Sequence, residues 1–191
     1  MPAERAGTST GDRRTARTRA ALRHALLALM SERGWDAIGV QEICERANVG
    51  RSTFYTHFRN KDELLSGGFD DLRQALRGTP AGGAARSSAT GGGVTDMPFV
   101  LGLIEHACEN RKLFRTLIGR RSGYVVHQRF KQMLVALVEE ELQAVPPDVP
   151  RAAAARWTAG ALFELLSWWV ESRSPATPKD LLEMARRLST L

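Results

Sequence analysis

The chain has 191 residues, with 27 Lys and Arg against 21 Asp and Glu, which gives a formal net charge of +6. This length allows one or two compact domains, and the positive balance suits a polyanionic partner, although many proteins without such a partner are mildly basic. No apolar run reaches the roughly 18 residues that a membrane-spanning helix needs, and the N-terminus lacks the apolar core of a signal peptide. We therefore expect a cytoplasmic protein that has no membrane partner. The two cysteines, Cys44 and Cys108, lie in apolar helical patterns typical of buried thiols in a reducing compartment.

The first 14 residues are rich in Gly, Thr, Ala and Arg and contain almost no large apolar side chain. Such a segment cannot bury enough surface to fold alone, so residues 1–14 are expected to form a flexible basic arm. Arg5, Arg13 and Arg14 could bring this arm to the minor groove or the phosphates of DNA, and a solvated tail explains the same residues equally well.

A long helix is predicted from Thr15 to Arg33. Its buried face consists of five apolar side chains at helical spacing: Leu22, Ala25, Leu26, Leu29 and Met30. Gly34 is a natural left-handed stop for this helix, and Trp35 and Ile38 are expected to pack the connection that follows.

Residues 40–58 have the pattern of two short helices joined by a tight turn. The first helix carries apolar side chains at positions i, i+3, i+4 and i+7, namely Val40, Ile43, Cys44 and Ala47. The pattern breaks at Asn48 and Gly50, which tolerate the left-handed backbone of a sharp turn. Ser52 is expected to cap the second helix, in which Phe54 and Phe58 lie one turn apart on the buried side.

The opposite side of this second helix carries hydrogen-bond donors: Arg51, Ser52, Thr53, Tyr55 and His57. Two short helices joined by a tight turn, the second polar and cationic outside, form a helix-turn-helix. Such a motif can place its second helix in the major groove of DNA.

A fourth helix is predicted to begin after Phe58. Asn60 and Glu63 resemble a capping box, and apolar spacing continues the helix to about Arg77. Lys61 lies in its first turn, beside free backbone N–H groups and the positive end of the helix dipole, which favours a bound phosphate. Residues 15–77 are therefore the predicted helix-turn-helix DNA-binding domain.

Residues 15 to about 76 resemble the N-terminal domain of the TetR family of bacterial transcriptional regulators. The matching stretches are Arg33-Gly34-Trp35, Ile43-Cys44-Glu45-Arg46-Ala47, Ser52-Thr53-Phe54-Tyr55-Thr56-His57-Phe58 and Asn60-Lys61-Asp62-Glu63-Leu64-Leu65. The Thr-Phe-Tyr-x-His-Phe block followed by Lys is more specific than a generic helix-turn-helix. Two positions depart from the family pattern. Gly39-Val40 stands where the family usually has Thr or Ser, which removes a hydroxyl cap and a phosphate contact, and Asn48 replaces the usual turn glycine, which the backbone tolerates.

Residues 78–95 consist mainly of Gly, Ala, Ser and Thr, which predicts a flexible linker longer than the family's usual connection. Helical spacing then returns and predicts five more helices. They run from about Thr95 to Cys108, over Leu113–Ile118, from Ser122 to Ala144, from Pro150 to Ser172, and from Pro178 almost to Leu191. No strand pattern is present, so the expected fold is all-α with about nine helices. The resemblance implies that residues 96–191 form a ligand-binding and dimerisation domain.

The helix over residues 150–172 is apolar on nearly all sides, so nearly all its sides must be covered. A bundle of this size has few helices to do so, and a second subunit packed through the last two helices is the economical solution. The resemblance implies the same dimer, with Trp168 or Trp169 as an anchor. A monomer with a central buried helix is the alternative. The expected interface residues are Trp157, Ala161, Trp168, Leu181 and Leu188.

The resemblance also implies a cavity for a small-molecule effector, which we expect to be lipophilic. The side chains that could line it are His106, Phe114, His127, Phe130, Phe163 and Glu164. For each residue the ordinary alternative weighs more. Plain core packing explains the three phenylalanines, a surface position or local bonding explains the two histidines, and a solvated strip of the helix explains the glutamate. No cofactor or metal is expected, because His106 and Cys108 point to different faces of their helix.

The sequence therefore predicts a homodimeric, ligand-responsive transcriptional repressor. Two-fold symmetry requires a palindromic operator with half-sites roughly 34–36 Å apart, and an effector would favour a dimer whose recognition helices are wrongly spaced. The expected phosphate contacts are Thr53, Tyr55, His57 and Lys61. The expected base contacts are Gln41, Arg51 and Ser52.

Two alternatives stand beside this prediction. The first is a DNA-binding regulator without a small-molecule effector, which the long linker favours. The second is a helical-bundle enzyme using His106, Cys108 or His127. No nucleophile is paired with a base at a convincing spacing and no phosphate-cradling glycine motif is present, so no enzymatic activity is expected.

Overall fold

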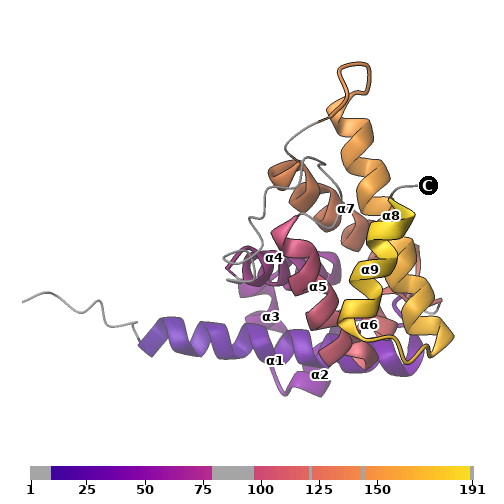
Figure 1. The fold of residues 1–191 in the computed structure, drawn as a ribbon. Coiled ribbons are helices and arrows are strands. Elements are labelled where there is room, and N and C mark those ends of the chain that lie inside the picture. Colours follow the sequence, from indigo (N-terminus) through magenta and orange to yellow (C-terminus); the bar gives the residue numbers. More distant parts are fainter. Residues whose placement is uncertain (1–9, 79–96, 121, 143–144, 190–191) are drawn as a thin grey trace, which may run out of the picture. The chain divides into compact units, whose positions relative to one another are not determined.

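The computed structural model describes residues 10–78, 97–120, 122–142 and 145–189, and the described chain consists of nine α-helices without a strand. In chain order (Figure 1) they are α1 (Thr10–Arg33), α2 (Val40–Ala47), α3 (Arg51–His57), α4 (Lys61–Gly78), α5 (Pro98–Glu109), α6 (Arg111–Ile118), α7 (Tyr124–Glu141), α8 (Arg151–Ser172) and α9 (Pro178–Leu188). The prediction of an all-α fold with about nine helices is confirmed. Among these helices, none combines the length and the hydropathy of a membrane span.

The chain divides into two compact units, Met1–Ser66 and Gly67–Leu191. We call them unit 1 and unit 2 and describe each by itself. The boundary falls inside α4, whereas the sequence placed it near Arg77, at the end of that helix. The predicted linker, residues 78–95, lies outside the described residues except for Gly78, which ends α4.

In unit 1, α1 begins at Thr10, five residues before the predicted start. Residues 10–14, predicted to belong to a flexible arm, are therefore helical, and Arg5 lies outside the described residues. Arg13 and Arg14 are good helix formers, Asp12 in the first turn suits the helix dipole, and lengthening an existing helix requires no new nucleation. The helix ends where predicted, since Gly34 has φ 78° and its N–H donates to the Met30 carbonyl at 3.0 Å.

The core of unit 1 forms where α1, α2, α3 and the start of α4 bury their apolar faces. Its members are Leu22, Ala25, Leu26, Leu29, Met30, Trp35, Ile38, Ile43, Cys44, Phe54, Phe58, Leu64 and Leu65. The Arg46 guanidinium also binds the Glu32 carboxylate through two hydrogen bonds of 2.7 and 2.8 Å, which ties α2 to α1. The helix-turn-helix is thus held on a single packed base.

Helix α4 starts with the predicted side-chain cap, and its last turns pack within unit 2. Asn60 Oδ1 accepts a hydrogen bond from the Glu63 N–H at 2.9 Å, and the Glu63 carboxylate accepts one from the Arg59 N–H at 2.6 Å. Within unit 2, Phe69 meets Phe130 of α7 with ring centroids 5.6 Å apart. The guanidinium of Arg77 also donates to the Glu140 carboxylate of α7 at 2.8 Å. These contacts explain why the last turns of α4 belong to unit 2.

The rest of unit 2 is a bundle in which α7 packs on α8, α6 on α7 and α8, and α5 on α6 and α9. Two arginines of α6 bind backbone carbonyls where α8 ends. Arg111 donates to the carbonyls of Trp169 and Ser174 at 2.6 and 2.8 Å, and Arg115 donates to that of Val170 at 2.9 Å. Since the last carbonyls of a helix have no partner within it, these guanidinium groups stabilise the C-terminus of α8.

Candidate nucleic-acid interface and unit 2 surfaces

Helix α2 begins at a position that lacks the hydroxyl cap usual in the resembling family. The Glu42 carboxylate accepts a hydrogen bond from the Gly39 N–H at 2.8 Å and lies 2.6 Å from the Arg33 guanidinium. The bond to Gly39, followed by the bond to Arg33, holds the pKa of Glu42 below its usual 4.5. The carboxylate therefore replaces part of the missing cap. It does not replace the phosphate contact, because a carboxylate repels phosphate.

The turn between α2 and α3 has the backbone that its sequence predicted. Asn48 adopts the left-handed region, with φ 52° and ψ 47°. Its N–H donates to the Glu45 carbonyl at 3.2 Å, and the Val49 N–H donates to the Cys44 carbonyl at 2.9 Å. Asn48 is thus a workable substitute for glycine in this turn.

Helix α3 begins one residue earlier than expected, and Ser52 is not its cap. Gly50 precedes the helix, and Ser52 lies in the first turn with an exposed side chain. Phe54 and Phe58 are buried as predicted, with ring centroids 5.9 Å apart. The Ser52 hydroxyl is therefore not committed to a helix cap.

The outer side of α3 is polar. Arg51, Ser52, Thr53 and Tyr55 are exposed, and His57 is half-buried. Tyr55 is 51% exposed, and its ring packs edge-on against Phe54 at 5.4 Å between centroids. A tyrosine whose ring is supported and whose hydroxyl reaches solvent can donate a hydrogen bond to a phosphate.

A shallow hollow lies beside the turn and brings together two of the predicted base-contacting residues, Gln41 and Arg51. The Gln41 amide donates to the Glu45 carboxylate at 2.9 Å, so the two side chains act as a pair. Glu45 and Asn48 also line the hollow, and sequence reasoning missed both. The sequence feature that could have pointed to this surface was the i, i+4 spacing of the polar residues Gln41 and Glu45. A glutamate can accept from the cytosine amino group, and an asparagine can pair with adenine.

Lys61 has a role that its sequence position did not reveal. Its ammonium donates to the carbonyls of Trp35 and Ile38 at 3.0 and 2.9 Å and lies 4.4 Å from a Trp35 ring centroid. These bonds fix the connection between α1 and α2 to the start of α4. An ammonium has three donors, and these two hydrogen bonds use two of them.

The interior of unit 2 is filled by the phenylalanines predicted to line an effector cavity. Phe114, Phe130 and Phe163 are buried. Ring centroids lie 6.0 Å apart for Phe114 and Phe130, and 6.2 Å apart for Phe130 and Phe163. Such distances are those of packed aromatic pairs.

The other predicted effector residues surround this cluster or lie outside it. His106 packs edge-on against Phe114 and His127 against Phe163, at 5.8 and 5.2 Å between centroids. Glu164 is instead exposed, with its side chain 71% accessible and 3.5 Å from Lys131 Nζ. Glu164 therefore lies on the solvated strip of α8 rather than in the interior. Among the described residues, no group of three or more His, Cys, Asp and Glu is placed to hold a metal ion.

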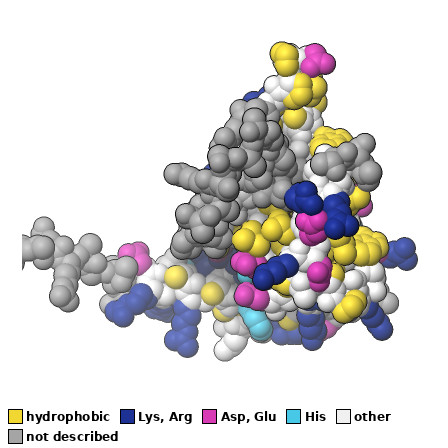
Figure 2. Space-filling view, viewed as in Figure 1, with side chains coloured by type: hydrophobic (Ala, Val, Ile, Leu, Met, Phe, Trp, Pro, Cys, Tyr) yellow, Lys and Arg dark blue, Asp and Glu magenta, His cyan; other side chains and the backbone are white. Residues whose placement is uncertain are grey.

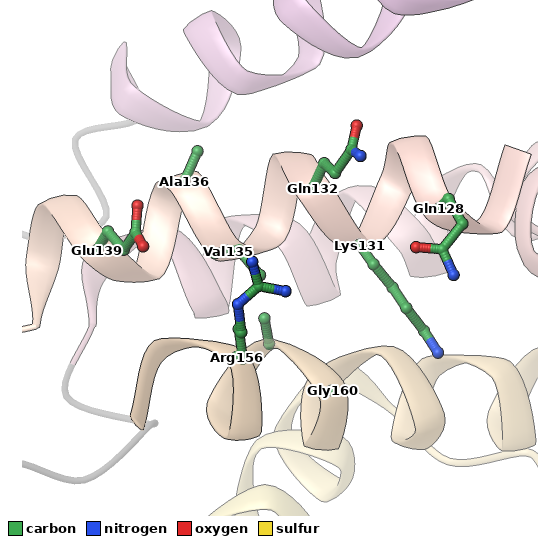
Figure 3. Close-up of a pocket in the computed structure, with 9 residues that line it drawn as sticks. Gln128, Lys131, Gln132, Val135, Ala136, Glu139, Arg156 and Gly160 are labelled. Carbon is green, nitrogen blue, oxygen red and sulfur yellow. The ribbon is translucent and has the colours of Figure 1, made fainter. Parts of the chain in front are cut away.

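A surface groove of about 290 Å³ runs between α7 and α8 (Figure 3). Its lining is Gln128, Lys131, Gln132, Val135, Ala136, Glu139, Arg156, Ala159 and Gly160. The Arg156 side chain extends from α8 toward α7, and Lys131 extends from α7 toward α8 (Figure 3). Five of the groove's nine lining residues are polar or charged, and its lining includes none of the six side chains predicted to line an effector cavity.

Several large apolar side chains of α8 and α9 reach the surface (Figure 2). Trp157 is 64%, Trp168 49% and Leu188 53% exposed, and Ala161 is exposed as well. Trp169, the other candidate anchor, is buried, and the Arg111 guanidinium lies 4.3 Å from a centroid of its ring. Leu181, predicted at the dimer interface, is also buried within its own chain. Residues 157, 161 and 168 share one stripe of α8, because they are spaced by four and seven residues.

Two family profiles match this chain. The profile described as bacterial regulatory proteins, tetR family, matches residues 22–67. The profile described as transcriptional regulator C-terminal region matches residues 97–191. Together they include the helix-turn-helix and all the described helices from α5 onward.

A curated relative and two solved structures extend the comparison. The uncharacterized HTH-type transcriptional regulator YxbF of Bacillus subtilis (strain 168) is 41% identical over 66 residues, which is 34% of this chain but only 17% of that relative's length. A TetR transcriptional regulator from Streptococcus agalactiae 2603V is 26% identical, with 94% of this chain and 97% of that one covered and a TM-score of 0.66. The regulator FadR from Bacillus subtilis, solved in complex with stearoyl-CoA, is 18% identical, with 90% and 96% covered and a TM-score of 0.57. At that identity the likeness to FadR shows a shared fold.

The matched helix-turn-helix, the matched C-terminal region and the likeness over nearly the whole chain agree with one another. This chain belongs to the TetR family of bacterial transcriptional regulators and carries the family's DNA-binding helix-turn-helix at its N-terminus.

Proposed function

We propose that this protein is a homodimeric repressor that binds a palindromic operator and is released by a small-molecule effector. The observation that carries the proposal is the polar outer side of α3 on a packed apolar base. Phe54 and Phe58 fix the helix to the core, while Arg51, Thr53 and Tyr55 remain exposed. One such helix per protomer would enter the major groove in each half-site.

Contacts to the DNA backbone would come from Thr53, Tyr55, His57 and the remaining N–H of Lys61. Contacts to base edges would come from Gln41, Arg51 and Ser52, with Glu45 and Asn48 as additional candidates. Arg51 favours guanine and Gln41 favours adenine, although Gln41 must first leave its hydrogen bond to Glu45.

The dimer would form through the exposed stripe of α8, made by Trp157, Ala161 and Trp168, together with Leu188 of α9. Tryptophan is one of the side chains enriched among residues that dominate interface energies. Two tryptophans that are each about half exposed or more support an interface at this stripe. A dimer of this kind presents two copies of α3 related by two-fold symmetry, which is the reason for a palindromic operator.

An effector would act by stabilising a dimer in which the two α3 helices are wrongly spaced for the operator. It can shift the population only by binding that state more tightly than the DNA-bound state. The stearoyl-CoA bound to the FadR relative supports a lipophilic compound as the effector. It would have to enter beside His106 and His127 and displace the packed Phe114, Phe130 and Phe163. The packing of these rings favours a second candidate function, a regulator of the same kind without a small-molecule effector.

The binding experiment begins with selection of an operator from random duplexes by the purified full-length chain. Its affinity is then measured by fluorescence anisotropy at fixed salt for wild type, Tyr55→Ala and Tyr124→Ala. Tyr124 is 77% exposed in unit 2 and provides a matched control. We expect Tyr55→Ala to weaken binding about 10-fold and Tyr124→Ala to leave it unchanged. Equal affinity of all three proteins, or failure to select any sequence, would contradict the proposal.

A thermal-shift screen with acyl-CoA and other lipophilic compounds separates the two candidate functions. A true effector raises the melting temperature and also lowers the affinity for the selected operator. If no compound does both, the regulator without an effector is the better description.

A further inference from the structure

The first turns of α1 form an exposed helix, which we call the α1 extension, residues 11–20. Every side chain in it is exposed except that of Thr18, which is half-buried. Figure 1 shows this end of α1 projecting beyond α2 and α3, within unit 1. In Figure 2 Lys and Arg side chains lie along it. The side chains of the extension therefore do not belong to the core of unit 1.

The extension is strongly cationic. It contains Arg13, Arg14, Arg17 and Arg19 against a single acidic residue, Asp12. Within the described part of the chain, no carboxylate forms an ion pair with Arg13, Arg14 or Arg17. At 3.6 residues per turn these three side chains fall within about 100° of one another, so they share one face of the helix.

The C-terminal end of the extension lies beside the end of α3. The Arg19 guanidinium carbon lies 5.5 Å from the ring centroid of Phe58, the residue that follows α3. From Arg19 to Arg13 the helix rises about 9 Å, which is less than three base steps along a DNA strand. Because the extension and α3 belong to one packed unit, a duplex bound to α3 that continues past Phe58 would come within reach of these arginines.

The composition of the extension favours DNA over other partners. A helix that lies on a membrane needs an apolar face with residues such as Leu, Phe or Trp, and residues 11–20 contain none. A helix that packs on a protein groove needs apolar anchors at i, i+3 and i+7, which are also missing. Arginine guanidinium groups without carboxylate partners match the geometry and charge of phosphate oxygens.

We propose that the α1 extension is a second DNA-binding surface, on which Arg13, Arg14 and Arg17 bind phosphates adjacent to those met by α3. This inference rests on the proposed function, because it requires that α3 sits on DNA. The contacts would add affinity and salt dependence without adding base specificity.

The test compares four full-length proteins on the selected operator, embedded in a duplex with ten further base pairs on each side. They are wild type, Tyr55→Ala, the extension variant (Arg13→Ala, Arg14→Ala, Arg17→Ala) and the unit 2 control (Lys112→Ala, Arg129→Ala, Lys179→Ala). The control removes the same charge from exposed positions of unit 2. Alanine is the best helix former, so neither triple variant is expected to unfold a helix. Affinity is measured from 50 to 200 mM salt, and hydroxyl-radical footprints locate the protected sugars.

We expect the extension variant to bind at least 10-fold more weakly at about 0.1 M salt. The slope of log affinity against log salt should fall by up to about 0.9 for each phosphate that the variant no longer neutralises. Its footprint should lack the protection next to the recognition-helix contacts, while the same operator is still preferred over others. Tyr55→Ala should instead weaken binding and keep that flanking protection, and the unit 2 control should behave like wild type.

If the extension variant has the same affinity, salt dependence and footprint as wild type, the inference is overturned and the proposed function is unaffected. Failure of wild type to prefer any operator would overturn both. Loss of binding to acidic phospholipid vesicles in the extension variant, with its DNA footprint unchanged, would assign the extension to a membrane surface instead.

Discussion

Lys61 shows how one residue can serve both the fold and the site. Its ammonium binds two backbone carbonyls in the connection between α1 and α2, and that connection leads directly into the helix-turn-helix. The position and charge of Lys61 in the sequence predicted that it contacts a phosphate of DNA. Its hydrogen bonds show that it also stabilises the connection between α1 and α2. A loss of DNA binding on mutation would therefore have two possible causes, which stability measurements separate.

We expect Lys61→Met to destabilise the protein by roughly 2–3 kcal/mol. The substitution keeps the apolar stem but leaves the carbonyls of Trp35 and Ile38 without their charged donor. Thermal or urea unfolding checks this, with Lys179→Met as a control at an exposed position of unit 2. Equal stability of both variants would mean that the two hydrogen bonds contribute nothing to folding.

Glu42 gives unit 1 a defined response to acid. The Gly39 N–H and Arg33 lower the pKa of Glu42 in the folded chain. The stabilising effect of the carboxylate is therefore fully present above about pH 4.5, the usual pKa, and is lost as the pH falls through the lower pKa of the folded chain. We expect Glu42→Gln to lower the melting temperature at pH 7 and to have a smaller effect near pH 4. A difference between the two proteins that does not depend on pH would show that the charge of Glu42 is irrelevant.

At the scale of elements, α6 and α8 are joined by hydrogen bonds that cross the bundle. The Arg111 guanidinium donates to two carbonyls at the end of α8 and lies against the Trp169 ring. We expect Arg111→Met to destabilise unit 2 by about 2–4 kcal/mol, and Lys112→Met, at the adjacent exposed position, to change stability by less than about 0.5 kcal/mol. Chemical denaturation of both variants makes the comparison, and similar values would contradict the assigned role of Arg111.

Local patterns predicted the number and order of the helices, because apolar spacing, Gly34, Asn48 and Pro178 act within a few residues. The same patterns failed where structure depends on distant partners or on the absence of a core. The start of α1 was missed because its exposed turns carry no apolar period. The carbonyl partners of Lys61 and the burial of Leu181 come from tertiary packing, which a single sequence does not display.

The candidate site divides in the same way. The exposed face of α3 was predictable residue by residue, since Phe54 and Phe58 define the buried side and leave the rest outside. The contribution of Glu45 and Asn48 to the hollow beside the turn could not be predicted from the sequence, because it depends on how α2 meets α3 in space. The position of the unit boundary inside α4 depends on Phe69 meeting Phe130, a contact between residues far apart in the chain.

At the scale of the whole molecule, the proposed function depends on a dimer. Trp168→Glu places a charge at one end of the exposed stripe of α8 without touching the core, since Trp168 is 49% exposed. We expect the folded protein to become monomeric, with association weakened more than about 100-fold. Sedimentation velocity measures the change, and Tyr124→Glu provides an exposed aromatic control. A Trp168→Glu variant that sediments like wild type would move the interface elsewhere.

Operator recognition as proposed requires two chains acting together, each reading one half of an inverted repeat. The most direct measurement is the mass of the complex formed with the selected operator and with a duplex that contains only one half-site, determined by sedimentation or native mass spectrometry. We predict two chains on the inverted repeat and much weaker binding to the single half-site. A complex with one chain per duplex, and equal affinity for both duplexes, would contradict this mode of recognition.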